Sequence, residues 1–390
     1  MIWLYWITGL ATTAIWLVAV TQAVMNLSRI ADIMTPEWLP SDQVSLPWLT
    51  IVAPGRNEEA ALEPALRSLA ELDYPNFQVI ALDDRSTDRT GAIMDRVASD
   101  SGGKIRVLHI TELPAGWLGK THAMWLGAQQ GAGEWILFTD ADCLFERTAL
   151  RRAVFYAEQQ RLDHLVVVPT AIMGTVGEKM MLSFFQTMFS VVHRPWKVSD
   201  PRAKDYVGMG AFNMVRRDVY KRIGTYERLR LEVVDDMKLG EAVKRGGFRQ
   251  NIALGAGLVS LRWAAGAMGV VRNLEKNLFA YLQFRVTFML GACLGLFFLG
   301  VWPFLGLVLA PGWSRVGFAV GLALCAVNFW KMARYSEVSP FFFLMYPVAA
   351  SLAGFAILKS TFLALRDGGV TWRGTKYSLK ELRMAARSGD

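Results

Sequence analysis

Cysteine and histidine are scarce in this sequence. Only 3 cysteines and 4 histidines occur among its 390 residues. Cys143, Cys293 and Cys325 form no C-x-x-C pair, and two of them lie within apolar runs. The histidines are scattered, without the short spacings that metal ligands show. Neither a disulfide framework nor a zinc site is therefore expected.

Charged residues are also few. They make up 19% of the chain, whereas hydrophobic residues make up 53% and the mean hydropathy is +0.27. Soluble proteins rarely have such a composition, so segments that cross a membrane are expected. The net charge of +8 fits either nucleic acid or an anionic membrane surface. Because no DNA- or RNA-binding motif is found, the lipid bilayer is the expected partner and nucleic acid is not.

Long apolar runs lie towards both ends of the sequence. The first has neither a basic segment before it nor a small-residue cleavage site after it, which predicts an uncleaved transmembrane anchor over residues 1–30. Three further runs predict C-terminal transmembrane helices over 286–365, followed by a basic tail at 366–390. These three runs cover 286–310, 316–330 and 341–365.

The charges that flank these runs conflict with one another. Arg29 is the first basic residue after the apolar run 3–24, which favours a cytoplasmic position for the following domain. Three crossings after a cytoplasmic domain would leave the tail outside. The tail is basic, however, and basic segments stay inside. The conflict disappears if one of the three runs is re-entrant or interfacial.

Between the anchor and the C-terminal runs, short β-prone segments alternate with helical patterns. The alternation predicts an α/β domain at 48–260 with a mostly parallel sheet and crossover helices. The expected strands are 49–53, 77–82, 105–110, 135–139 and 165–168, and the expected helices are 59–72, 87–99 and 121–130.

Three of the expected strands end in polar clusters. Parallel strands bring their carboxyl ends to one edge of the sheet, where ligands bind. Acidic side chains there can accept hydrogen bonds from a base N–H or a ribose hydroxyl. Because three strand ends carry polar clusters, the sequence predicts a single site at this edge. The clusters contain Pro54, Asn57 and Glu58 after the first strand, Asp83 and Asp84 after the second, and Asp140 and Asp142 after the fourth.

Asp140 and Asp142 are candidate metal ligands. They stand two residues apart after a buried strand, and their carboxylates suit a hard divalent cation that completes its shell with water and substrate phosphates. The alternative is an Asp-rich turn without a ligand. The other polar strand ends favour the metal site.

Further candidates lie outside these strand ends. Lys120 either meets a phosphate or is a solvated lysine at a helix start. Gly208 and Gly210 allow the backbone to approach a ligand, although a lone G-x-G is weak evidence. Asp235 and Asp236 begin a helical pattern, where acids favour the helix dipole. Alternatively, one of these two acids is a general base.

Two segments mix apolar and basic residues. The segment 176–198 has a broad apolar arc, typical of either a core helix or an amphipathic helix in the membrane interface. Its basic flanks favour the interface. The segment 261–285, just before the C-terminal runs, is expected to be interfacial too.

These motifs, in this order, resemble those of family 2 inverting glycosyltransferases with the GT-A fold. The segments 116–123 and 370–374 are similar to membrane-bound lipid glycosyltransferases, such as ceramide glucosyltransferase and hopanoid- or carotenoid-associated groups. The resemblance covers roughly residues 48–285. Its motifs are Pro54-x-x-Asn57-Glu58, Asp83-Asp84-x-Ser86-x-Asp88, Gly119-Lys120, Asp140-x-Asp142, Gly208-x-Gly210 and Asp235-Asp236.

The resemblance implies a Rossmann-like catalytic domain that transfers one sugar from a nucleotide-diphospho-sugar to a hydroxyl of a membrane lipid, with inversion. The expected donor is a UDP-hexose. Mg²⁺ or Mn²⁺ would be held by Asp140 and Asp142, with Asp142 as the more direct ligand, and Asp236 would be the general base. The implied donor-binding residues are Pro54, Asn57, Glu58, Asp83, Asp84, Lys120, Asp140, Gly208 and Gly210.

Two departures from the family pattern matter. The position usually occupied by Glu-Asp is Asp235-Asp236, so either acid fits the role of the base. The Gln-x-x-Arg-Trp motif is not intact, because Val259 stands where glutamine is expected before Arg262-Trp263. This difference disfavours a processive polysaccharide synthase and weakens the sphingolipid assignment. The synthase and a non-catalytic membrane scaffold are the alternatives. The expected location is a bacterial plasma membrane, with the catalytic domain in the cytoplasm.

Overall fold

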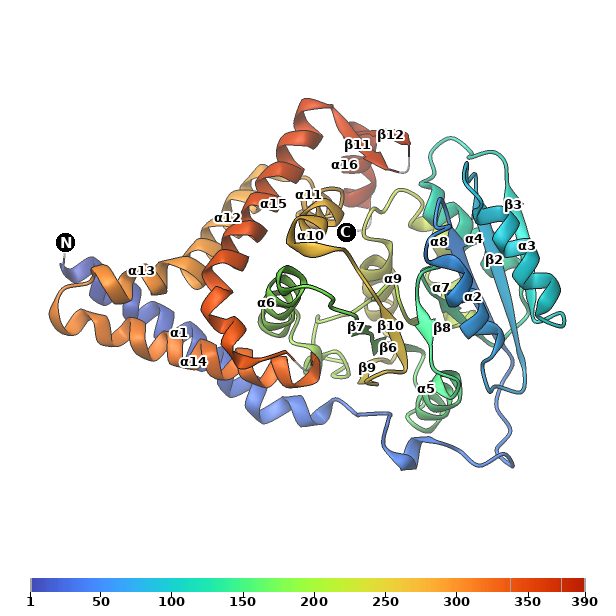
Figure 1. Ribbon diagram of the computed structural model, residues 1–390, viewed down its shortest axis with the longest axis horizontal. Coiled ribbons are helices and arrows are strands. Elements are labelled where there is room, and N and C mark those ends of the chain that lie inside the picture. The colour runs from blue at the N-terminus through green and yellow to red at the C-terminus, as the bar shows by residue number, and fades with distance from the viewer. Residues whose placement is uncertain (1, 337, 373, 389–390) are drawn as a thin grey trace. The chain divides into compact units, whose positions relative to one another are not determined.

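The computed structural model describes residues 2–336, 338–372 and 374–388. It divides into two compact units (Figure 1). We call them the helical unit, which comprises 1–29, 173–194 and 263–383, and the sheet unit, which comprises 30–172, 195–262 and 384–390. The predicted boundaries at 48–260 and 261–285 stay predictions.

The sheet unit is built around a seven-stranded sheet with the order β3-β2-β1-β4-β8-β6-β9. β1 is parallel to β2 and β4, β2 is parallel to β3, and β6 is parallel to β9, whereas β8 is antiparallel to both of its neighbours. The predicted mostly parallel sheet is therefore confirmed. The strands are β1 (Leu49–Gly55), β2 (Phe77–Asp84), β3 (Ile105–Ile110), β4 (Trp135–Phe138), β6 (His164–Val168), β8 (Asn213–Arg216) and β9 (Gln250–Leu254).

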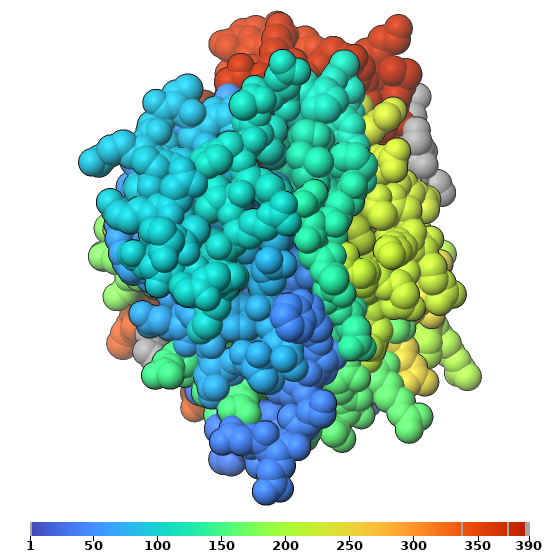
Figure 2. All heavy atoms as spheres, turned by 90° about the vertical axis from the view of Figure 1, so that its right-hand side faces the viewer, coloured from blue at the N-terminus to red at the C-terminus, as the bar shows by residue number. Residues whose placement is uncertain are grey.

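Helices cover both faces of this sheet, so its central strands β1 and β4 are buried at every position. Successive side chains of a strand point to opposite faces. Accordingly, Ile51 and Ala53 join one core cluster with α2 and α3, and Val52 joins a second cluster with α4 and α9. In Figure 2, the segment that contains β1, α2, β2, α3 and β3, coloured blue to cyan, covers much of the visible face. The helices are α2 (Leu62–Ala70), α3 (Thr90–Asp100), α4 (Gly119–Gln130), α5 (Ala149–Gln159), α7 (Arg217–Arg222), α8 (Thr225–Arg228) and α9 (Asp235–Arg245). A three-stranded sheet of β5 (Leu144–Phe145), β10 (Val259–Leu261) and β7 (Thr170–Ala171) completes the unit.

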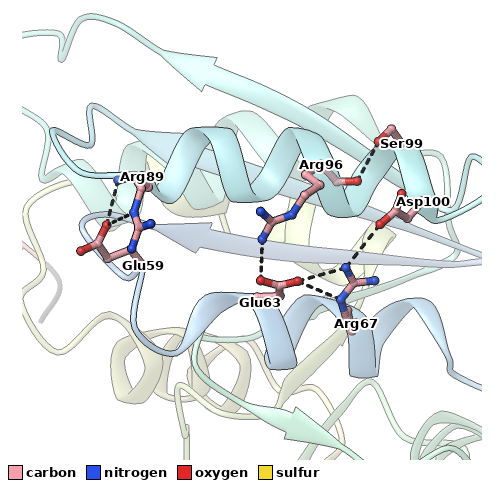
Figure 3. Close-up of polar contacts among 7 residues, drawn as sticks. All are labelled: Glu59, Glu63, Arg67, Arg89, Arg96, Ser99 and Asp100. Carbon is pink, nitrogen blue, oxygen red and sulfur yellow. Dashed lines mark hydrogen bonds and ion pairs between the residues drawn. The ribbon is translucent and has the colours of Figure 1, made fainter.

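Exposed ion pairs join α2 to α3 beside the first two strands (Figure 3). The carboxylate of Glu63 binds Arg67 on its own helix and Arg96 on α3, and Arg67 also reaches Asp100. Exposed pairs of this kind contribute little stability individually. A separate pair, Arg89 with Glu59 at 3.2 Å, links the loops after β1 and β2.

Among its described residues, the helical unit contains four helices that are long and apolar enough to cross a membrane, at 2–29, 286–309, 312–336 and 340–366. This agrees with the predicted anchor and three C-terminal runs, although the middle run is longer than the predicted 316–330. The second helix consists of α12 (Val286–Leu296), a π-helical turn η4 (Phe297–Val301) and α13 (Trp302–Leu309). The others contain α1 (Ile2–Asn26), α14 (Arg315–Ala333), and the short helix η7 (Pro340–Met345) with α15 (Tyr346–Arg366).

The segment 176–198, for which the sequence favours the membrane interface, contributes to the core of the helical unit. It forms α6 (Val176–His193), and Met180, Met181 and Phe184 are buried in a cluster with residues of α14 and α15. Its apolar arc is therefore largely covered by protein, as in the core-helix alternative. Shorter elements complete the unit: α10 (Gly266–Leu274), α11 (Leu278–Tyr281), β11 (Gly369–Trp372) and β12 (Thr375–Ser378). The last helix, α16 (Leu379–Ser388), belongs to the helical unit up to Arg383 and to the sheet unit after it.

We expect Arg152 to hold the linker after the anchor against the sheet unit. Its buried Nη1 donates hydrogen bonds to the carbonyls of Ile33, Met34 and Thr35, each at 3.0 Å. Arg152→Gln should therefore lower the free energy of unfolding by about 2–4 kcal/mol. It should also speed proteolysis of the segment 34–47. The exposed Arg106→Gln is the control, and equal protease resistance in the two variants would contradict the assignment.

Candidate active site

Most of the predicted site residues lie along the carboxyl edge of β1, β2 and β4 in the sheet unit. They form two groups. The first surrounds the loops after β1 and β2, and the second is an acidic cluster between the end of β4 and the start of α9. The first group contains Pro54, Asn57, Glu58, Asp83 and Asp84, and the second contains Lys120, Asp140, Asp142, Gly208, Gly210, Asp235 and Asp236.

In the first group, the loops after β1 and β2 bind each other. The side chain of Asn57 accepts a hydrogen bond from the backbone N–H of Thr87 at 2.8 Å, and its own N–H donates to the hydroxyl of Ser86. Asn57 has a φ of 54°, a left-handed conformation that asparagine tolerates better than most residues. The backbone N–H of Glu58 donates to Thr90 at 2.8 Å. Asn57 thus shapes the loop as well as lining its rim.

Asp83 and Asp84 have different surroundings. Asp83 accepts hydrogen bonds from the N–H of Ser86 and pairs with His109 at 3.1 Å, so its carboxylate is engaged by the protein. Asp84 is fully buried and binds the guanidinium of Arg85 at 2.7 Å. Arg85 has no distinctive signal in the sequence, because it is an isolated arginine in a polar loop.

In the second group, the ammonium of Lys120 lies between two carboxylates. Its Nζ is 2.8 Å from Oδ1 of Asp140 and 3.4 Å from Oδ1 of Asp235, and only 11% of its side chain is exposed. A lysine in the first turn of a helix opposes the helix dipole. The two acids compensate for that cost, and they favour the charged ammonium so strongly that the pKa of Lys120 is raised despite its burial. Lys120 is therefore not a solvated surface lysine.

Two glycines allow the backbone to approach the acids closely. A methyl group at Gly208 would overlap the carbonyl of Asp236, and one at Gly210 would overlap the carboxylate of Asp140. The N–H of Asp140 also donates to the carbonyl of Gly210 at 2.9 Å. The G-x-G segment therefore packs against the acidic cluster, and its glycines are explained by that contact.

The acids of this cluster are held in an unfavourable environment for negative charge. Burial and the neighbouring carboxylate of Asp235 raise the pKa of Asp236 to about 7. Burial likewise raises the pKa of Asp235, against the opposing effect of Lys120. Burial and the charge of Asp140 raise the pKa of Asp142. Additional positive charge at Asp140 and Asp142 would therefore be favourable.

A buried chain of hydrogen bonds ends at the backbone carbonyl of Asp236. Gln250 donates to Nδ1 of His164 at 2.9 Å, His164 donates through Nε2 to Asn213, and Asn213 donates to the backbone carbonyl of Asp236 at 3.2 Å. Burial lowers the pKa of His164 to about 4, so the ring is neutral at pH 7. Asn213, His164 and Gln250 lie on β8, β6 and β9, so three strands position the start of α9. These three residues have no shared signal in the sequence, because they become neighbours only when the strands pair.

Asp140 and Asp142 fit a divalent cation whose other ligands come from the substrate and from water. The described residues contain no group of three His, Cys, Asp or Glu side chains that could hold an ion alone. Two carboxylates with a deficit of positive charge can do so when phosphate oxygens and water supply the remaining ligands. The raised pKa of Asp142 is consistent with that requirement.

Comparisons with known proteins identify relatives of the chain. Residues 50–224 match the family model described as Glycosyl transferase family 2. A 4,4'-diaponeurosporenoate glycosyltransferase from Staphylococcus haemolyticus is 24% identical over 59% of this chain and 60% of its own length. One from Staphylococcus aureus is 23% identical over 85% of this chain and 89% of its own. The chain thus spans less than two thirds of the first relative and most of the second.

A solved structure has a similar fold. A mannosyltransferase from Pyrobaculum calidifontis, in complex with GDP-Man and Mn²⁺, aligns with a TM-score of 0.54 at 19% identity. The alignment covers 93% of this chain and 99% of that one. The predicted GT-A fold and the predicted family resemblance are both confirmed.

We expect Asn213→Ala to loosen the start of α9. It removes the donor to the carbonyl of Asp236 and leaves the ring N–H of His164 without its acceptor. The free energy of unfolding should fall by about 1–3 kcal/mol, and hydrogen exchange should rise at the amides of 236–239. Asn251→Ala is the control, because it removes a bond to Tyr156 elsewhere on β9. Equal exchange at 236–239 in the two variants would contradict the role of Asn213.

Proposed function

We propose that this protein transfers one sugar from a nucleotide-diphospho-sugar to a membrane lipid, with inversion at the anomeric carbon. The match of residues 50–224 to the model of Glycosyl transferase family 2 supports this proposal. The acidic cluster with its buried lysine at the sheet edge carries this proposal. In this cluster Asp236, whose pKa is raised, lies near Asp140 and Asp142, whose carboxylates suit a metal ion. The four long apolar helices favour an acceptor that resides in the membrane.

The loops after β1 and β2 are the proposed site of the nucleotide. They lie at the carboxyl edge of the sheet, where α/β folds bind nucleotides. Pro54, Glu58 and Asp84 would contact the base and ribose, and the Asn57–Thr87 bond would hold the loops in shape. The proposed donor is a UDP-hexose.

Asp140 and Asp142 would hold Mg²⁺ or Mn²⁺ together with the diphosphate of the donor. Such an ion, when bound, offsets the negative charge that develops on the leaving diphosphate. The ammonium of Lys120 is positively charged, like such a metal ion, and lies beside Asp140. It would keep the acids ionised before the donor arrives.

Asp236 is the proposed general base. With a pKa of about 7, its carboxylate is partly ionised at neutral pH and basic enough to accept a proton from a hydroxyl. The acceptor oxygen then bonds to the anomeric carbon while the bond from that carbon to the diphosphate breaks. The proton moves to Asp236, and this single displacement inverts the configuration. Asp235 is less suited, because its carboxylate is occupied by Lys120 and is within reach of the hydroxyl of Tyr226.

The proposed acceptor is a lipid of the carotenoid or hopanoid type. The two staphylococcal relatives are named for diaponeurosporenoate, which supports a polyisoprenoid acceptor here. We place the protein in a bacterial plasma membrane, with the sheet unit in the cytoplasm, where nucleotide sugars are made.

The direct test is UDP release by the full-length protein in lipid nanodiscs, with UDP-hexoses and polyisoprenoid alcohols. Turnover should require a divalent cation and should fall at least about 1,000-fold in Asp236→Asn. The exposed Asp218→Asn is the matched control and should keep full activity. A glycolipid that carries one sugar is the expected product by mass spectrometry.

Three results would contradict the proposal. A long polymer product would indicate a processive synthase. Donor binding without turnover on any lipid would favour a non-catalytic scaffold. Full activity of Asp236→Asn with an alcohol acceptor would exclude Asp236 as the base.

The rate should depend on pH through Asp236. Because the base acts in its ionised form, kcat/KM should rise as the pH passes about 7 and should fall below it. Lys120 lowers the pKa of the nearby acids, so Lys120→Gln should move this rise to higher pH whatever its effect on the maximal rate. Lys104 lies just before β3 and contacts Phe77 at the start of β2, away from the acidic cluster. Lys104→Gln should therefore leave the pH of the rise in kcat/KM unchanged. A shift to lower pH in Lys120→Gln would contradict the assignment.

A further inference from the structure

The direction of α14 within the helical unit follows from its contacts with α1. Gly9 of α1 faces Gly317 of α14, and Thr12 faces Gly321, so residue numbers increase together along both helices. Thr13 also donates to the carbonyl of Gly317 at 2.6 Å. The two helices are therefore parallel. The end of α14 lies on the same side of the membrane as the end of α1, which continues directly into the sheet unit; we call this side the near side.

The preceding helix runs in the opposite direction. α13 ends at Leu309, three residues before the helical segment that contains α14 begins at Gly312. Gly306 of α13 packs on the ring of Phe318 in α14, as expected for a hairpin. Val286, at the start of α12, is therefore on the near side. Residues 263–285, which lead into it, are on the near side as well.

The last apolar helix, α15, returns to the near side. In its first half, Ala350 faces Gly300, which lies in the middle of the helix 286–309. In its second half, Lys359 forms an ion pair with Glu275 at 2.5 Å. Ser360 accepts a hydrogen bond from the N–H of Phe279 at 3.1 Å. Glu275 and Phe279 precede α12 and lie on the near side, so α15 runs from mid-depth back to the side from which α14 emerges.

The orientation of α15 agrees with these contacts. Figure 1 shows α15 crossing the direction of α1 and α14 at a steep angle instead of running alongside them. Its 21 residues are about 32 Å long, enough to span a bilayer. Length alone therefore does not distinguish a helix that crosses the membrane from one that returns to the same side.

The tail after α15 also contacts near-side residues. The guanidinium of Arg383 in α16 donates to the carbonyl of Phe284 at 3.1 Å, two residues before α12 begins. The ammonium of Lys276 lies 5.1 Å from the ring centre of Trp372 in β11. These contacts are independent of α15, and they place the tail at the start of α12.

We infer that η7 and α15 form a re-entrant segment that enters the near-side leaflet and leaves it on the same side. The membrane is then crossed three times, by α1, by α12 to α13 and by α14. The partner of the exposed apolar face of α15 is the acyl chains of the near-side leaflet. That face contains Phe355, Leu358 and Phe362, which are 48–62% exposed. Between its ends, the backbone groups of α15 are hydrogen-bonded within the helix, as the hydrocarbon region requires.

This arrangement removes the conflict between the charges. With three crossings, the sheet unit and the tail lie on the same side of the membrane. The basic residues of the tail, which include Lys376, Lys380 and Arg383, then lie beside the near-side leaflet. Anionic lipids attract such residues, and basic segments stay in the cytoplasm.

Cysteine labelling of the full-length protein in sealed vesicles tests this inference. Single cysteines are placed at Ser99 of the sheet unit, at Lys380 of the tail, and at Trp313 in the turn before α14, in a background without the three native cysteines. A membrane-impermeant maleimide is applied to inverted and to right-side-out vesicles. Ser99→Cys and Lys380→Cys should be labelled in the same vesicles, and Trp313→Cys only in the opposite ones. Labelling of Lys380→Cys together with Trp313→Cys would overturn the inference.

A second measurement does not depend on the cysteine-free background. The wild-type chain with a C-terminal epitope is treated with protease in the same two vesicle preparations. The epitope should be lost only in the vesicles in which the sheet unit is digested. Protection of the epitope in those vesicles, with loss in the opposite preparation, would establish a fourth crossing and exclude the re-entrant segment.

Discussion

The buried ammonium of Lys120 is the interaction on which the candidate site depends. It joins Asp140, at the end of β4, to Asp235, at the start of α9. Without this cation, the acids at the sheet edge would repel one another in a partly desolvated space. Lys120 therefore allows the protein to concentrate negative charge where a metal ion and a diphosphate are expected to bind.

The surroundings of this charge cluster are built to hold it in place. Gly208 and Gly210 bring the backbone against Asp236 and Asp140, where any larger residue would overlap them. Behind α9, the chain from Gln250 through His164 to Asn213 satisfies the buried carbonyl of Asp236. Because this network is fully buried and its histidine is neutral at pH 7, it adds rigidity without adding charge.

In the helical unit, the position of charged side chains also carries structural information. The ion pair of Lys359 with Glu275 lies where α15 meets the segment before α12. Elsewhere α15 exposes apolar side chains. The position of the ion pair, more than the hydropathy of the helix, indicates where α15 leaves the membrane, because a charged pair is costly in the hydrocarbon region.

Local sequence determined much of this architecture. Continuous apolar runs marked the strands β1 to β4 and the four long helices, and the polar residues after β1, β2 and β4 marked the site edge. The pairing of Asn213 and His164, the antiparallel strand β8 and the burial of Lys120 depend on contacts between residues distant in the chain, which local patterns do not encode. The same is true of α15. Its apolar composition allows a crossing or a re-entrant path, and only its contacts with Gly300, Glu275 and Phe279 distinguish them.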